Sequence, residues 1–92
     1  MLLAIDVGNT NIVLGCIEDG KIVFSGRLTT DAKKTDFEFA AMLKGILSLN
    51  KIEASSFDGA IISSVVPQVN KPLRKAVKLV IGKEPHTVKN II

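Results

Sequence analysis

Three short apolar runs, separated only by turn-forming residues, fill the start of this sequence and confine it to folds that begin with an antiparallel sheet. The runs cover residues 2–5, 11–17 and 21–28. Asp19 and Gly20 lie between the second and third runs. An Asp-Gly pair there is a strong hairpin signal because both turn residues accept a positive φ. The pattern therefore predicts three strands joined one after another as an antiparallel meander.

A helix and a buried strand follow the meander. Thr35 and Glu38 match a capping box, which marks a helix start, and we expect the helix to stop near Asn50. Its apolar residues fall on one face: Phe39, Ala40, Leu43, Ile46 and Leu47. Residues 58–64 are predicted to form a buried strand because their apolar residues are consecutive rather than alternating, and Pro67 ends the strand.

A second helix and a last strand complete the predicted order. Asn70 is the expected N-cap, with Pro72 in the first turn and Gly82 as the stop. The apolar positions have near-ideal helical spacing: Val69, Leu73, Ala76, Val77, Val80 and Ile81. Residues 86–92 are predicted to form a fifth strand.

The predicted order β-β-β-α-β-α-β describes an α/β fold with a mixed five-stranded sheet covered by helices. Right-handed crossovers place the fourth and fifth strands parallel to the first. By analogy of element order, this is the ribonuclease H-like topology, which is also that of each lobe of the actin-like ATPase fold.

Composition fits one small domain of 92 residues and excludes several classes of protein. A hydrophobic content of 47% is too high for a disordered chain. The single cysteine, Cys16, excludes an intramolecular disulfide and favours a reducing compartment. No apolar run approaches the length of a membrane span, and we expect no membrane partner.

The charge pattern does not point to nucleic acid. The net charge is only +3, and the chain has no Trp or Tyr on which bases could stack. The basic residues that gather near the C-terminus are interpreted as the solvated face of the second helix: Lys71, Arg74, Lys75 and Lys78. We expect no nucleic-acid partner.

The segment that follows the first strand carries the most chemistry. Asp6 stands at the carboxyl end of that strand, and Gly8 lets the backbone approach an anion closely. The next residues, Asn9, Thr10 and Asn11, add polar donors. A carboxylate for hydrated Mg²⁺ beside a donor-rich turn suits the terminal phosphates of ATP. An ordinary hairpin explains the same residues equally well.

Three motifs in matching order resemble the type III pantothenate kinase family of the actin-like, sugar kinase and heat-shock ATPase superfamily. Residues 6–11 read D-V-G-N-T-N, which is similar to the first phosphate-binding motif of that superfamily. Residues 27–31 read R-L-T-T-D, and residues 63–67 read S-S-V-V-P, and both are similar to family segments. The resemblance covers essentially the whole chain.

The resemblance implies ATP-dependent phosphorylation of pantothenate to 4'-phosphopantothenate, the first step of coenzyme A synthesis. It also implies Mg²⁺, a monovalent cation such as K⁺ or NH₄⁺, a homodimer and a cytoplasmic location. Asp6 would organise Mg²⁺ through water. The residues implied to bind the ATP phosphates are Asp6, Val7, Gly8, Asn9, Thr10, Asn11, Ile12 and Val13.

The family's catalytic aspartate lies in a G-x-D-R motif, and this sequence contains none. Phosphoryl transfer needs a group at the acceptor hydroxyl as well as a phosphate cradle. We therefore expect residues 1–92 to be the N-terminal lobe of such a kinase, with no catalytic residue in this chain, the second lobe outside it, and no activity alone.

Two alternatives remain. A ribonuclease H-type nuclease shares the topology and would cluster Asp6 with Asp36 or Glu38, but Asp58 is expected at the opposite end of the sheet. The second alternative is a non-catalytic relative on the same fold, which binds nucleotide or acts as a regulator without catalysing a reaction.

Several single residues have weaker signals. Ser63 and Ser64 are candidate phosphate or substrate contacts because the carboxyl ends of parallel strands attract ligands. Local backbone bonding is their alternative role. Cys16 is expected to be a buried apolar residue, and His86 to face solvent. Arg27 is interpreted either as a partner of a carboxylate or as support for a dimer.

Overall fold

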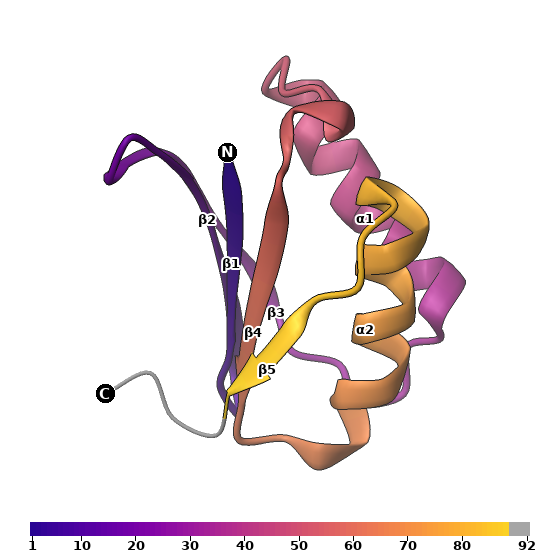
Figure 1. Cartoon of the computed structure of the whole chain (residues 1–92). Coiled ribbons are helices and arrows are strands. Elements are labelled where there is room, and N and C mark those ends of the chain that lie inside the picture. Colours follow the sequence, from indigo (N-terminus) through magenta and orange to yellow (C-terminus); the bar gives the residue numbers. More distant parts are fainter. Residues whose placement is uncertain (89–92) are drawn as a thin grey trace.

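The computed structural model describes residues 1–88 and has the predicted order of elements. Two helices and a five-stranded sheet make up the fold, with one short 3₁₀ turn, η1 (Figure 1). Their bounds are β1 Leu2–Val7, β2 Asn11–Glu18, β3 Lys21–Thr29, α1 Asp36–Leu49, η1 Ala54–Ser56, β4 Gly59–Ser64, α2 Pro67–Ile81 and β5 His86–Val88. The predicted last strand is confirmed over His86–Val88, and its residues 89–92 lie outside the described part.

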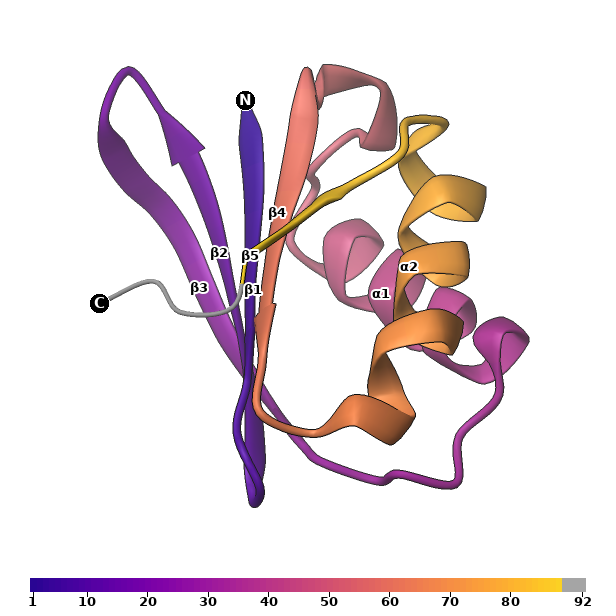
Figure 2. The same ribbon diagram turned by 60° about the horizontal axis from the view of Figure 1, so that its bottom comes forward.

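The sheet has the order β3-β2-β1-β4-β5. The β1–β2 and β2–β3 pairs are antiparallel, whereas β4 runs parallel to both β1 and β5. Both helices lie against the same face of the sheet (Figure 2). The antiparallel meander and the parallel later strands are therefore confirmed, and the fold is ribonuclease H-like.

Burial alternates along β1 and shows which face forms the core. Leu3, Ile5 and Val7 are buried beneath the helices, while Ala4 and Asp6 lie on the opposite face. One continuous cluster joins these residues to the buried stripes of α1 and α2. Asp6 thus stays out of the core because it occupies the face that no helix of the described residues covers.

The β2–β3 hairpin forms as its sequence predicts. Asp19 has φ 52° and Gly20 has φ 75°, so both central residues of the turn are left-handed. This geometry matches the twist of the two flanking strands.

Cys16 lies in β2 and is fully buried, as predicted, and this burial raises the pKa of its thiol.

The capping box at the start of α1 is present. The Glu38 backbone N–H donates to Thr35 Oγ1 at 3.2 Å, and the Thr35 backbone N–H donates to Glu38 Oε1 at 2.9 Å. Hydrogen bonding of the Glu38 carboxyl by the Thr35 backbone N–H, and then by the Thr35 side chain, lowers the pKa of Glu38. The helix ends at Leu49 with Asn50 as its C-cap, as predicted.

Replacing the cap, Thr35→Ala, is expected to lower the free energy of unfolding by about 1 kcal/mol. Because the folded-state pKa of Glu38 is lowered, its contribution is present above the unfolded pKa and is lost as pH falls through the folded value. Urea denaturation at pH 7 and pH 3 measures both effects. Ser48→Ala, at an exposed position of the same helix, is the control and should change little. Equal stability of Thr35→Ala and wild type at pH 7 would contradict this role for the cap.

The predicted N-cap of the second helix is wrong. Helix α2 begins at Pro67, with Val66 as N-cap, so Asn70 and Pro72 both lie inside it. Pro67 suits the first helical position because its missing N–H has no intrahelical partner there. The Val69 N–H donates to the Val66 carbonyl at 3.0 Å, and this bond closes the first turn of α2. The predicted stop is confirmed, since Gly82 has φ 75°.

The basic face of α2 is exposed, as predicted from its spacing. Arg74 and Lys78 contact the Glu84 carboxylate at 2.8 Å and 3.6 Å. Among the described residues, no helix has the length and apolar character needed to cross a membrane.

Candidate phosphate site

The β1–β2 loop and the carboxyl ends of β1 and β4 meet at one end of the sheet. In the sheet register, Asp6 lies between Val13 of β2 and Ser63 of β4. The backbone N–H of Val65 donates to the Val7 carbonyl at 3.1 Å and ties the two strand ends together. The structure therefore brings both serines to the strand end where Asp6 lies, as the parallel pairing predicts, with Ser63 opposite Asp6 and Ser64 opposite Val7.

The loop itself is a tight turn. The Gly8 N–H donates to the Asn11 carbonyl at 2.8 Å, and a Cβ added to Gly8 would lie 3.3 Å from that oxygen. Gly8 has no positive φ, so this position needs space rather than left-handed backbone. Asn9 and Thr10 are exposed at the tip with their polar side chains. The absence of a side chain at Gly8 therefore lets the Asn11 carbonyl lie close against the Gly8 backbone.

Thr30 braces the loop, and sequence reasoning did not assign it a role. Its Oγ1 donates to the Gly8 carbonyl at 2.8 Å, and its backbone N–H donates to the Thr10 carbonyl at 2.8 Å. Thr30 belongs to the R-L-T-T-D segment at residues 27–31. The R-L-T-T-D motif could have indicated this role, because it places the Thr30 hydroxyl directly after β3. The two bonds tie the loop to the residue that follows β3.

The eight residues implied to bind phosphate differ in what they can offer. Val7 and Ile12 are 1% exposed, so their side chains belong to the core, and the two residues pair with one another in the sheet. Val13 is 38% exposed and pairs with Asp6. Asp6 is an exposed carboxylate beside this loop, and it fits a hydrated Mg²⁺ held through water.

The two serines at the end of β4 point to opposite faces. Ser63 is 6% exposed and lies on the face of Asp6. Ser64 lies on the helix side, where its Oγ accepts the Val66 N–H at 3.0 Å and donates to the Val66 carbonyl at 3.1 Å. Ser64 therefore has the local backbone role that was its alternative.

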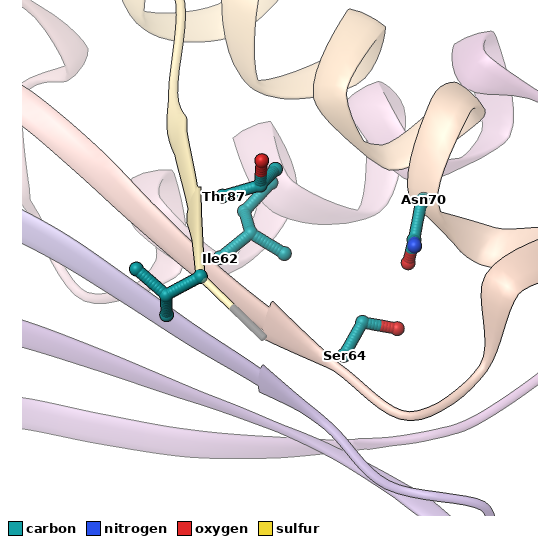
Figure 3. A pocket seen from close by; sticks show the side chains of 5 residues that line it. Ile62, Ser64, Asn70 and Thr87 are labelled. Atoms are coloured by element: carbon teal, nitrogen blue, oxygen red, sulfur yellow. The ribbon is translucent and has the colours of Figure 1, made fainter. Parts of the chain in front are cut away.

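A small cavity opens on the helix side of the same sheet end. We call it the β4–β5 cavity; its volume is about 170 Å³. The described residues that line it are Ile62, Ser64, Asn70, Thr87 and Val88. Figure 3 shows the side-chain oxygens of Ser64 and Asn70 directed into the same gap. Within the described residues, Asn70 Oδ1 is buried and has no hydrogen-bond partner.

The acidic residues that a nuclease would need lie apart. Asp58 Oδ2 accepts a hydrogen bond from the N-terminal amine of Met1 at 2.8 Å, at the opposite end of β1 from Asp6. That bond and the ammonium charge lower the pKa of Asp58. Glu38 is occupied in the capping box of α1. The structure thus confirms the prediction that Asp58 lies at the opposite end of the sheet from the loop.

The remaining candidates lie outside this site. Arg27 is exposed on the edge strand β3, opposite Val13 and on the face of Asp6. His86 is exposed at the start of β5, as predicted.

The strand order and the two helices on one face define a fold class, the ribonuclease H-like fold. The structure of Thermus thermophilus RuvC is similar, with a TM-score of 0.56 and 15% identity over 94% of this chain and 59% of that one. At this identity the likeness shows the fold alone.

Sequence comparison gives the family. A model described as type III pantothenate kinase matches residues 2–91, and the chain belongs to this family. A type III pantothenate kinase of Finegoldia magna is 45% identical over 92% of the chain, and one of Bifidobacterium longum subsp. infantis is 42% identical over 96%. The chain spans 32% and 34% of these curated relatives.

Proposed function

We propose that the protein to which this chain belongs transfers the γ-phosphoryl group of ATP to pantothenate, giving 4'-phosphopantothenate for coenzyme A synthesis. Residues 1–92 would be its N-terminal lobe and would hold the phosphates of ATP. The observation that carries this proposal is the Thr30 brace, which preorganises a turn beside the exposed Asp6. Family membership over residues 2–91 supports the choice of reaction.

Each part of the loop has a separate task in this proposal. Gly8, Asn9, Thr10 and Asn11 contact the phosphate oxygens. Asp6 holds the water shell of Mg²⁺. The metal, when bound, neutralises charge on the phosphates. A monovalent cation, K⁺ or NH₄⁺, and a cytoplasmic homodimer complete the proposal, and they rest on the resemblance alone.

The chain of 92 residues alone is expected to release no ADP in a pantothenate-dependent manner. It carries a phosphate loop but no G-x-D-R motif to act on the acceptor hydroxyl. A coupled ADP assay with and without pantothenate measures this. The full-length protein is the positive control and should show pantothenate-dependent release. Pantothenate-dependent ADP release by the 92-residue chain above background would show that it needs no further residues for catalysis, and would overturn this proposal.

A nucleotide-binding or regulatory relative is the second candidate, because the described residues build a loop for phosphate without an acceptor base. It predicts that the full-length protein binds ATP and leaves pantothenate unphosphorylated. The same assay separates the two functions. The nuclease is disfavoured because Asp58 lies at the far end of β1.

A further inference from the structure

The helix layer carries large apolar side chains that the described part of the fold leaves uncovered. Phe37 of α1 is 72% exposed and Leu79 of α2 is 56% exposed, although each helix buries its other face in the core. The two helices pack against one another on one side of the sheet (Figure 2). Large apolar side chains that gather at one place on a surface are typical of a binding site.

These two side chains belong to a groove between the helices. Two adjoining hollows, with volumes of about 480 Å³ and 340 Å³, share Phe37 and Leu79 among the residues that line them. We call the two hollows together the α1–α2 groove. Ala41 and Val80 add further apolar walls to the second hollow. Apolar grooves of this kind bind a helix, which lays its own apolar face into the groove.

Lysines border the apolar walls of the groove. Lys75 and Lys78 line the first hollow together with Asp36, and Lys44 lines the second. Lys78 lies 3.6 Å from the Glu84 carboxylate. Within residues 1–88, no carboxylate forms an ion pair with Lys44 or Lys75. The groove therefore has an excess of positive charge, which complements an acidic partner.

Charge and shape separate the candidate occupants of the groove. A second copy that docked groove to groove would bring its own lysines against these lysines, and like charges across an interface oppose binding. An anionic membrane matches the charge, but a membrane surface takes up a projecting apolar face rather than a concave one. A helix with an apolar stripe and acidic flanks matches both the apolar walls and the lysines.

We propose that the α1–α2 groove docks an acidic amphipathic helix of another protein. The apolar side chains of that helix would contact Phe37 and Leu79, and its carboxylates would pair with Lys44 and Lys75. None of the residues that line the groove belongs to the phosphate loop or to its Thr30 brace. Docking there does not depend on phosphoryl transfer.

The test is fluorescence anisotropy of a labelled probe peptide titrated with the full-length protein. The probe is a helical peptide of 14 residues, the length of α1, with leucines every three or four positions and glutamates beside them. A matched peptide carries lysines in place of the glutamates. We expect saturable binding of the acidic peptide, and binding at least about tenfold weaker for the basic one. Added salt should weaken the binding of the acidic peptide.

Four variants place the bound peptide on the protein. Leu79→Ala and Lys75→Glu change the groove, and each should weaken binding of the acidic peptide by at least about tenfold. Leu49→Ala and Lys71→Glu make the same changes at exposed positions of α1 and α2 outside the groove. These two controls should change the affinity by less than about twofold. All four side chains are exposed, so the melting temperatures should match wild type.

Three results of the titrations would overturn the proposal: no saturable binding of the acidic peptide, equal binding of both peptides, or wild-type affinity in Leu79→Ala and Lys75→Glu. Two other results would assign the groove to a different occupant and overturn it as well. Binding to phosphatidylglycerol vesicles that Leu79→Ala abolishes would indicate a membrane. A smaller oligomer for Leu79→Ala, measured by light scattering, would indicate a second copy. Each of these results would leave the proposed phosphoryl transfer intact.

Discussion

Asp6→Asn in the full-length protein is expected to lower kcat by about 10²–10³-fold, the usual effect of removing one preorganised electrostatic contact. The substitution keeps the size of the side chain but removes the charge that would organise hydrated Mg²⁺. Asp6 is exposed and packs against no part of the core, so the melting temperature should hardly change. Steady-state kinetics together with thermal unfolding measures both quantities.

Asp58→Asn is the matched control for this experiment. Asp58 is also an exposed aspartate at a strand end, but it bonds to the N-terminal amine at the far end of the sheet. The kcat of the Asp58→Asn variant should equal that of wild type. If Asp6→Asn and wild type had the same kcat and kcat/KM, Asp6 would have no role at the metal.

Phe57→Ala is expected to destabilise the fold by about 3–5 kcal/mol. Phe57 directly follows η1, is 1% exposed, and is the largest of the fully buried side chains. Its removal would leave a cavity where the core approaches the connection from η1 to the sheet. A loss of this size is a large share of the total stability of a small domain. Chemical denaturation followed by circular dichroism measures it.

Phe37→Ala separates burial from residue type. Phe37 lies in the first turn of α1 but is 72% exposed, so its replacement should cost less than about 0.5 kcal/mol. Similar losses for the two variants would contradict the assignment of Phe57 to the core.

Local signals made much of the fold predictable. The left-handed pair Asp19 and Gly20 and the capping box of Thr35 and Glu38 act within four residues of sequence, so the sequence alone shows them. The parallel pairing of β1 with β4 followed from the handedness of crossovers. The same rule predicts that Ser63 lies beside Asp6, as it does in the sheet register.

Contacts between distant residues were harder to predict. Thr30 bonds to a loop 22 positions earlier, and nothing in its neighbourhood indicates that partner except the motif around it. Asn70 resembles an N-cap because Pro72 follows it closely, but Pro67 starts the helix three residues sooner. The free Oδ1 of Asn70 depends on how α2 packs beside β4 and β5, which only the three-dimensional structure shows.

We propose that this chain is the phosphate-binding lobe of a pantothenate kinase. The most direct measurement is label transfer from [γ-³²P]ATP by the full-length protein, with the products separated by chromatography. We predict label in 4'-phosphopantothenate for the wild type, and a rate reduced by about 10²–10³-fold for Asp6→Asn. Label found only in inorganic phosphate, or none transferred by a folded protein, would contradict the claim.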